Sequence, residues 1–175
     1  MGNPRGRGRE RGGVSGLRLL GAGTVAFTAT GLGALLLWGN PLTWRLILTP
    51  EFGQSDKLLA VWLYLPPRPK LDLWRREAFP SAGQLQMAAL LYLLTLAHAW
   101  VYGVIRTALP GEGWRKGIGF GAGIWLFAYV FFELFTPFNL FGEPLHLLAY
   151  QLALWLGVAL IEGCAIAVVV EARER

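Results

Sequence analysis

Four long apolar stretches, separated by polar or basic segments, dominate the pattern of this chain. Between Arg18 and Arg45 there are 26 consecutive residues without an ionisable side chain, and between Glu77 and Arg106 there are 28 in which His98 is the only group that titrates near neutral pH. About 20 apolar residues are enough to cross the hydrocarbon core of a bilayer. Helices of a soluble bundle would need a polar face for water, so the pattern predicts membrane-spanning helices instead.

The fold class that follows is an all-α integral membrane protein with four transmembrane helices. We expect these helices at about residues 17–39, 85–107, 117–136 and 145–170. Residues 1–16 are then a basic cytoplasmic tail, and residues 17–175 are a single membrane domain with an external loop at 40–84. Within that loop, Ser55–Leu65 begins with a helix-capping residue and continues as an apolar run, which predicts a short helix lying in the membrane interface.

Composition and charge agree with this class and suggest an orientation. The chain is 54% hydrophobic and only 15% charged, with a formal net charge of +5. Lys and Arg in short flanking segments favour the cytoplasmic side, which places both termini there, as in a bacterial inner membrane. The basic residues of loop 40–84 oppose this assignment but are fewer. The arginines of the tail fit contact with bound anionic lipid, so we expect lipid and protein partners and no nucleic acid.

Small residues mark two of the predicted helices as packing surfaces. The third helix carries glycine at every second position, so that two GxxxG pairs overlap: Gly117 with Gly121, and Gly119 with Gly123. Glycines four residues apart form a groove that a neighbouring helix can approach closely. The first helix also presents small residues, including Gly21 and Gly31. We therefore expect the first and third helices to pack against each other through these glycines.

Ionisable side chains inside a bilayer are costly, so each one needs a partner or a function. A rise of about 1.5 Å per residue places His98 in the second helix and Glu162 in the fourth at nearly the same depth. Glu133 and His146 form a second candidate pair near the outer interface. The simplest interpretation is that each pair is a hydrogen bond that locks two helices together.

A second interpretation gives His98 a cofactor. A neutral imidazole in an apolar helix is a common axial ligand of haem iron, and the magnesium of chlorophyll accepts the same ligand. His146 lies too far from His98 along the membrane normal to act as a second ligand of the same ring. We expect no other metal site, and the single cysteine, Cys164, excludes an internal disulfide.

These observations favour a non-catalytic accessory subunit of a larger membrane complex, such as an electron-transfer or photosynthetic assembly with His98 near a tetrapyrrole. The alternative is a small oligomeric transporter, channel or proton-conducting module that uses His98 and Glu162. A membrane-bound enzyme using Glu133 and His146 is the weakest of the three interpretations, because no nucleophile accompanies them.

Overall fold

The computed structural model describes residues 14–48, 82–135 and 144–172, and this part of the chain is helical without any strand. The helices are α1 (Gly16–Trp38), α2 (Pro41–Leu48), α4 (Ala82–Ile105), α5 (Trp114–Ile124), the π-helical segment η2 (Trp125–Val130), α6 (Phe131–Phe135) and α7 (Leu145–Glu171). Because α5, η2 and α6 follow one another without a break, they form one long helix with a π-helical turn in its middle.

Four of these helices are long and apolar enough to cross a membrane: α1, α4, the combined α5–η2–α6 helix, and α7. This confirms the predicted fold class and the number of transmembrane helices. The second and third helices begin about three residues earlier than expected, at Ala82 and Trp114. The predicted interfacial helix at Ser55–Leu65, the tail at 1–13 and most of the first loop lie outside the described residues.

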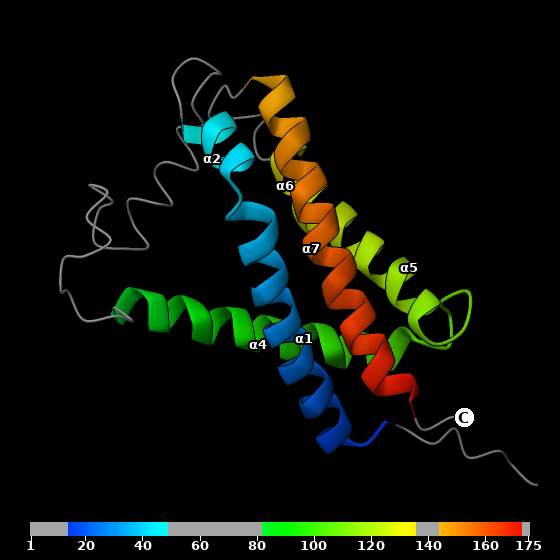
Figure 1. Ribbon diagram of the computed structural model, residues 1–175. Helices are drawn as coiled ribbons and strands as arrows, with labels where there is room; N and C mark the ends of the chain where they lie inside the picture. Colours follow the sequence, from blue (N-terminus) through cyan, green and yellow to red (C-terminus); the bar gives the residue numbers. More distant parts are fainter. Residues whose placement is uncertain (1–13, 49–81, 136–143, 173–175) are drawn as a thin grey trace, which may run out of the picture.

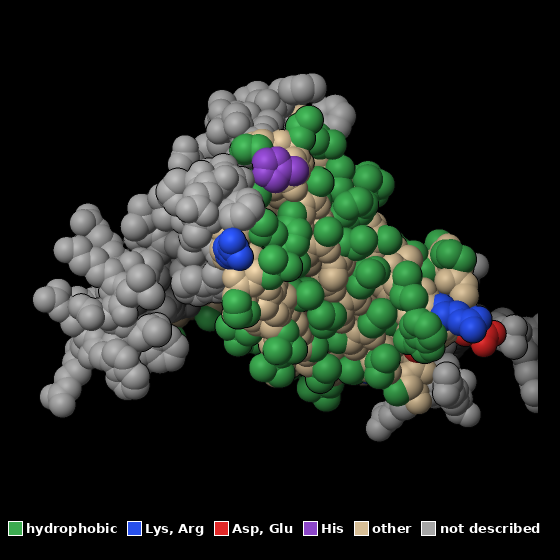
Figure 2. Space-filling view, turned by 45° about the horizontal axis from the view of Figure 1, so that its top comes forward, with side chains coloured by type: hydrophobic (Ala, Val, Ile, Leu, Met, Phe, Trp, Pro, Cys, Tyr) green, Lys and Arg blue, Asp and Glu red, His purple; other side chains and the backbone are tan. Residues whose placement is uncertain are grey.

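Figure 1 shows α1 and α7 lying side by side in opposite directions, with the α5–η2–α6 helix along the other flank of α7. Helix α4 crosses this group, and only its C-terminal half lies near α7. In the space-filling view, apolar side chains cover most of the visible face, and the charged side chains of the described residues lie at its margins (Figure 2). A membrane-embedded protein requires this distribution of apolar and charged groups.

The tightest helix contact is between α5 and α7, and it depends on glycine. A Cβ atom added to Gly117 would lie 2.6 Å from the Cα of Cys164, and one added to Gly121 would lie 2.5 Å from the carbonyl oxygen of Ala159. Gly163 of α7 meets the backbone of both α5 glycines in return. One GxxxG pair is thus filled by the backbone of α7, as expected for such a groove.

The predicted packing of the first helix against the third is wrong, because α1 and α5 each pack along α7 instead. Gly23 of α1 contacts Leu96 of α4, and Gly33 contacts Ile161 of α7. The remaining glycines of the prediction lie in open space, since an added Cβ would meet nothing within 4 Å among the described residues. They are Gly21, Gly31, Gly119 and Gly123. Helix α7 is therefore the common partner, which its own small residues make possible.

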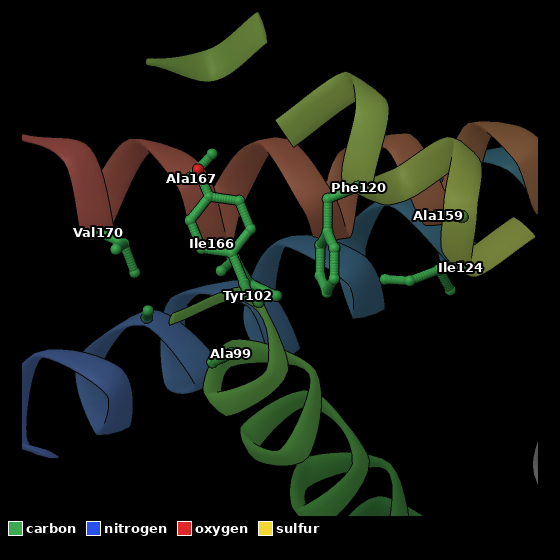
Figure 3. Close-up of a cluster of buried hydrophobic side chains, with 10 residues drawn as sticks. Ala99, Tyr102, Phe120, Ile124, Ala159, Ile166, Ala167 and Val170 are labelled. Atoms are coloured by element: carbon green, nitrogen blue, oxygen red, sulfur yellow. The ribbon is translucent and has the colours of Figure 1, made fainter. Parts of the chain in front are cut away.

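Larger side chains fill the space where α4 meets α5 and α7. Tyr102 of α4 is fully buried, and its ring lies 5.2 Å from that of Phe120 in an edge-to-face arrangement. Ile166 and Val170 of α7 are also fully buried and complete this core (Figure 3). The cluster holds the C-terminal half of α4 on the bundle and so determines where His98, one turn before Tyr102, is placed.

The connection between α1 and α2 shows how a short polar sequence ends one helix and begins another. The side chain of Asn40 donates to the carbonyl oxygen of Leu37 at 2.6 Å and accepts from the backbone N–H of Thr43 at 3.0 Å. Pro41 occupies the first helical position, where no N–H is needed. The hydroxyl of Thr43 lies 2.8 Å from that of Tyr150, which joins this corner to α7.

Candidate functional site

The most unusual feature of the bundle interior is a hydrogen-bonded pair between α4 and α7. Nδ1 of His98 lies 2.7 Å from Oε1 of Glu162. The side chain of Glu162 is only 5% exposed, while that of His98 is 20% exposed. A distance of 2.7 Å is typical of a hydrogen bond to a charged group, and a buried carboxylate requires such a donor.

The helix arrangement explains why these two residues meet. His98 is at the margin of the buried face of α4, whose next positions, Ala99 and Tyr102, lie in the core. Glu162 directly precedes Gly163, the residue of α7 that contacts the backbone of α5. Both residues therefore lie in the middle of the bundle, close to the place where α4, α5 and α7 meet.

The surroundings of the pair are mainly aromatic. The ring of Phe120 stands edge-on to that of His98, with 6.4 Å between the ring centres. Tyr129, in the π-helical segment η2, stacks on Trp155 of α7 at a ring separation of 4.7 Å. Glu162 thus has an imidazole partner within a mainly aromatic and apolar interior.

The pairing also distinguishes the two nitrogens of the His98 ring. With Glu162 ionised, Nδ1 is the donor, and Nε2 of the neutral imidazole keeps its lone pair. No hydrogen bond to Nε2 is found among the described residues. This is the arrangement in which a carboxylate orients a histidine whose other nitrogen can bind a metal.

The second predicted pair has a different environment. Glu133 is half-buried in α6, and His146 is exposed in the first turn of α7. Both residues lie toward the end of the bundle where α1 ends and α7 begins. Their pairing stays a prediction, but their exposure makes them less costly to place than the deeply buried Glu162.

Sequence reasoning missed a polar cluster at the other end of the bundle, here called the charged end. Its centre is Glu171, the last residue of α7 and 9% exposed. Oε1 of Glu171 lies 3.2 Å from the hydroxyl of Tyr102 and 3.6 Å from Nη1 of Arg106, while Oε2 lies 3.4 Å from Nζ of Lys116. The position of Glu171, directly after an apolar run and opposite a basic loop, was the signal that could have revealed this cluster.

The charged end also fixes α1. Nε of Arg18 donates to the backbone carbonyl of Val169 at 3.0 Å, which satisfies one of the last carbonyl groups of α7. A pocket of about 310 Å³ opens beside this cluster and is lined by Gly113, Trp114, Val168, Glu171 and Ala172. These contacts join helix ends, which indicates a structural role for the charged end, although Nη2 of Arg18 is buried without a hydrogen-bond partner among the described residues.

The described residues contain no group of three or more His, Cys, Asp or Glu side chains that could hold a metal ion. The predicted site residues thus divide into a hydrogen-bonded pair, His98 and Glu162, and two residues at the bundle end whose pairing stays a prediction, Glu133 and His146.

Comparisons of the chain with known protein families, with curated proteins and with solved structures find no match.

Proposed function

We propose that this chain is a non-catalytic accessory subunit that packs against a helix of a larger membrane protein complex. The observation that carries the proposal is the second glycine pair of α5. Gly117 and Gly121 form a groove filled by α7, whereas Gly119 and Gly123 form a groove with the same spacing that no described residue enters.

The filled groove supports this interpretation of the open one. The contact of α7 with Gly117 and Gly121 is backbone against backbone, so a GxxxG pair of α5 does allow a helix to approach closely. Glycine in a helix interior costs about 1 kcal/mol relative to alanine. Gly119 and Gly123 meet none of the described residues, and a helix from another protein accounts best for two such glycines.

The first turns of α4 add a second apolar surface for such a complex. Leu85, Leu90 and Leu91 are 56%, 63% and 48% exposed, and this part of the helix lies off the bundle (Figure 1). These side chains pack little against the other described residues. In the proposed complex, they contact the host subunits together with lipid.

The orientation proposed for the chain has both termini in the cytoplasm, as in a bacterial inner membrane. Arg18, Arg106 and Lys116 all lie at the charged end, together with the beginning of α1 and the end of α7. These basic residues support the orientation, because Lys and Arg near membrane helices favour the cytoplasmic side. Arg45 of α2, at the other end of the bundle, and the other basic residues of loop 40–84 oppose it.

The test is to isolate the chain from its source membranes in mild detergent and to identify every polypeptide that travels with it. We expect stoichiometric co-migration with larger membrane subunits. The double variant Gly119→Leu/Gly123→Leu should fold and lose these partners, because its new side chains fill the open groove. Gly31→Leu is the matched control, since Gly31 is also in open space but has no glycine four residues away.

Two results would contradict the accessory role. One is a particle that contains only this chain, and the other is full retention of the partners by the double variant. The first result would favour a second candidate, a proton-conducting or transport module built around Glu162.

This second candidate is supported by the buried hydrogen bond between Glu162 and the His98 imidazole, because ionisable groups inside a membrane bundle are typical of proton pathways. It predicts proton flux in vesicles that contain only this chain and loss of flux in Glu162→Gln. Vesicles with the unchanged protein and no flux would end this candidate.

A further inference from the structure

The geometry of His98 points to a specific ligand: we propose that Nε2 of His98 is the single axial ligand of a metal tetrapyrrole bound on the membrane-facing side of α4, and that Glu162 orients the imidazole. The inference goes beyond the accessory role and does not depend on the open glycine groove.

The two ring nitrogens of His98 differ in their hydrogen bonding. Nδ1 is committed to Glu162 at 2.7 Å, and Nε2 makes no hydrogen bond within the part of the chain that the structure describes. A histidine that served only to hold two helices together would need no more than the hydrogen bond to Glu162. A metal-binding histidine has this division of roles, because the carboxylate fixes the tautomer and increases the basicity of the other nitrogen.

The described residues limit the kind of metal that His98 could bind. An ion without its own ligands needs three or four protein groups, and the described residues offer no such cluster. A metal that arrives with four equatorial nitrogens needs only one axial ligand from the protein. Iron and magnesium tetrapyrroles fit this description, and both are bound through a neutral imidazole.

The imidazole of His98 lies at the margin of the buried face of α4, and its side chain is 20% exposed. The neighbours four residues before and three residues after it on α4, Leu94 and Val101, are 47% and 36% exposed. Residues at these spacings share a helix face. A flat apolar ring ligated by His98 would therefore lie over aliphatic side chains that otherwise face lipid.

The same geometry excludes a second axial ligand from the other histidine of the chain. His146 and Glu162 are 16 positions apart on α7, which corresponds to roughly 24 Å along the helix. The two axial ligands of one metal lie directly on either side of it. The sixth position, where the metal has one, therefore remains open to a small molecule or to a group from outside this chain.

The experiment uses the full chain purified in detergent and titrated separately with haem b and with chlorophyll a. We expect one of the two to bind with a stoichiometry of one per chain and to show the absorption change of imidazole ligation. Haem binding would assign the site to electron-transfer chemistry, and chlorophyll binding to light harvesting. Absence of saturable binding for both would overturn the proposal.

Three variants separate ligation from packing. His98→Gln keeps an amide to pair with Glu162 but removes the metal ligand, so the absorption change should disappear while helical content and elution volume stay the same. His98→Gly should regain the band when free imidazole is added. His146→Leu is the control that should bind normally. Binding of either pigment by His98→Gln at the affinity of the unchanged protein would contradict the inference.

Glu162 is a positioning residue in this proposal, and it has its own readout. In Glu162→Gln the amide oxygen still accepts from Nδ1, but the added electron density of a carboxylate is lost. We expect ligation with an affinity about 10- to 100-fold lower and a shifted absorption band. A purely structural role for Glu162 would change thermal stability and leave the band position unchanged.

Discussion

At the scale of single residues, the absence of a side chain at Gly163 is a strong constraint on the packing of α5 against α7. A Cβ atom at this position would collide with the backbone of Gly117 and Gly121. Backbone atoms cannot rotate away as a side chain can, so α5 and α7 would have to separate. The cost is that of an overpacked core rather than of a lost contact.

Gly163→Ala should therefore lower the free energy of unfolding by about 1–3 kcal/mol, measured by denaturant titration in detergent. Gly119→Ala is the matched control, because its new methyl group would meet nothing within 4 Å. The control should be neutral or more stable by up to about 1 kcal/mol, since alanine favours the helix. Equal losses of stability in both variants would show that the α5–α7 contact is not as close as the structure has it.

Only part of the candidate site could be predicted from the sequence. His98 and Glu162 can be placed at one depth from helix rise alone, because both helices cross the same bilayer. The depth does not say which faces of α4 and α7 are turned toward each other. Glu171 was missed because an acidic residue at the end of a helix looks like an ordinary solvated flank, and its burial arises only from the convergence of α4 and α5.

At the scale of helices, the π-helical turn at Trp125–Val130 is a feature that the apolar pattern does not reveal. A π-helical turn shifts the side chains after it around the helix axis. Here it lies where Trp125 donates from Nε1 to the carbonyl oxygen of Leu152 at 2.8 Å and where Tyr129 stacks on Trp155. These contacts join the second half of the α5–η2–α6 helix to α7, past the positions where Gly117 and Gly121 contact α7.

Trp125→Phe tests this joint, because it removes the donor and keeps an aromatic ring. The expected loss of stability is about 1 kcal/mol, as for one interhelical hydrogen bond. Thermal unfolding in detergent is the measurement. Trp114→Phe serves as the comparison, since the Trp114 side chain is 51% exposed, and it should change stability little. If the two variants cannot be told apart, the Trp125 hydrogen bond does not contribute to holding the helices.

The glycine pattern illustrates both the strength and the limit of element-level prediction. It correctly marked α5 as a helix with a close neighbour, because adjacent glycines permit backbone contact. It assigned the wrong neighbour, because small residues in α1 were conspicuous while those of α7 are mixed with larger ones. Ala159, Gly163 and Ala167 lie at four-residue spacing on α7, and all three are buried.

At the scale of the whole molecule, the proposed orientation predicts which helix ends react from outside the cell. In a Cys164→Ala background, His146→Cys should react with a membrane-impermeant maleimide in intact cells. Ser15→Cys and Glu112→Cys, at the charged end, should react only after the membrane is opened. The physical reason is the retention of basic segments in the cytoplasm. Labelling of Glu112→Cys in intact cells would reverse the orientation.

The sequence by itself determined the membrane class and the four spanning helices, and it predicted a depth for each ionisable residue. These follow from run length and helix rise, which are local quantities set by the thickness of the bilayer. Only the tertiary structure decided that α7 is the common partner, that one glycine groove is filled by α7 while no described residue enters the other, and that Nδ1 of His98 pairs with Glu162. Those features depend on the rotation of each helix about its own axis, and an all-round apolar helix carries almost no pattern that would fix it.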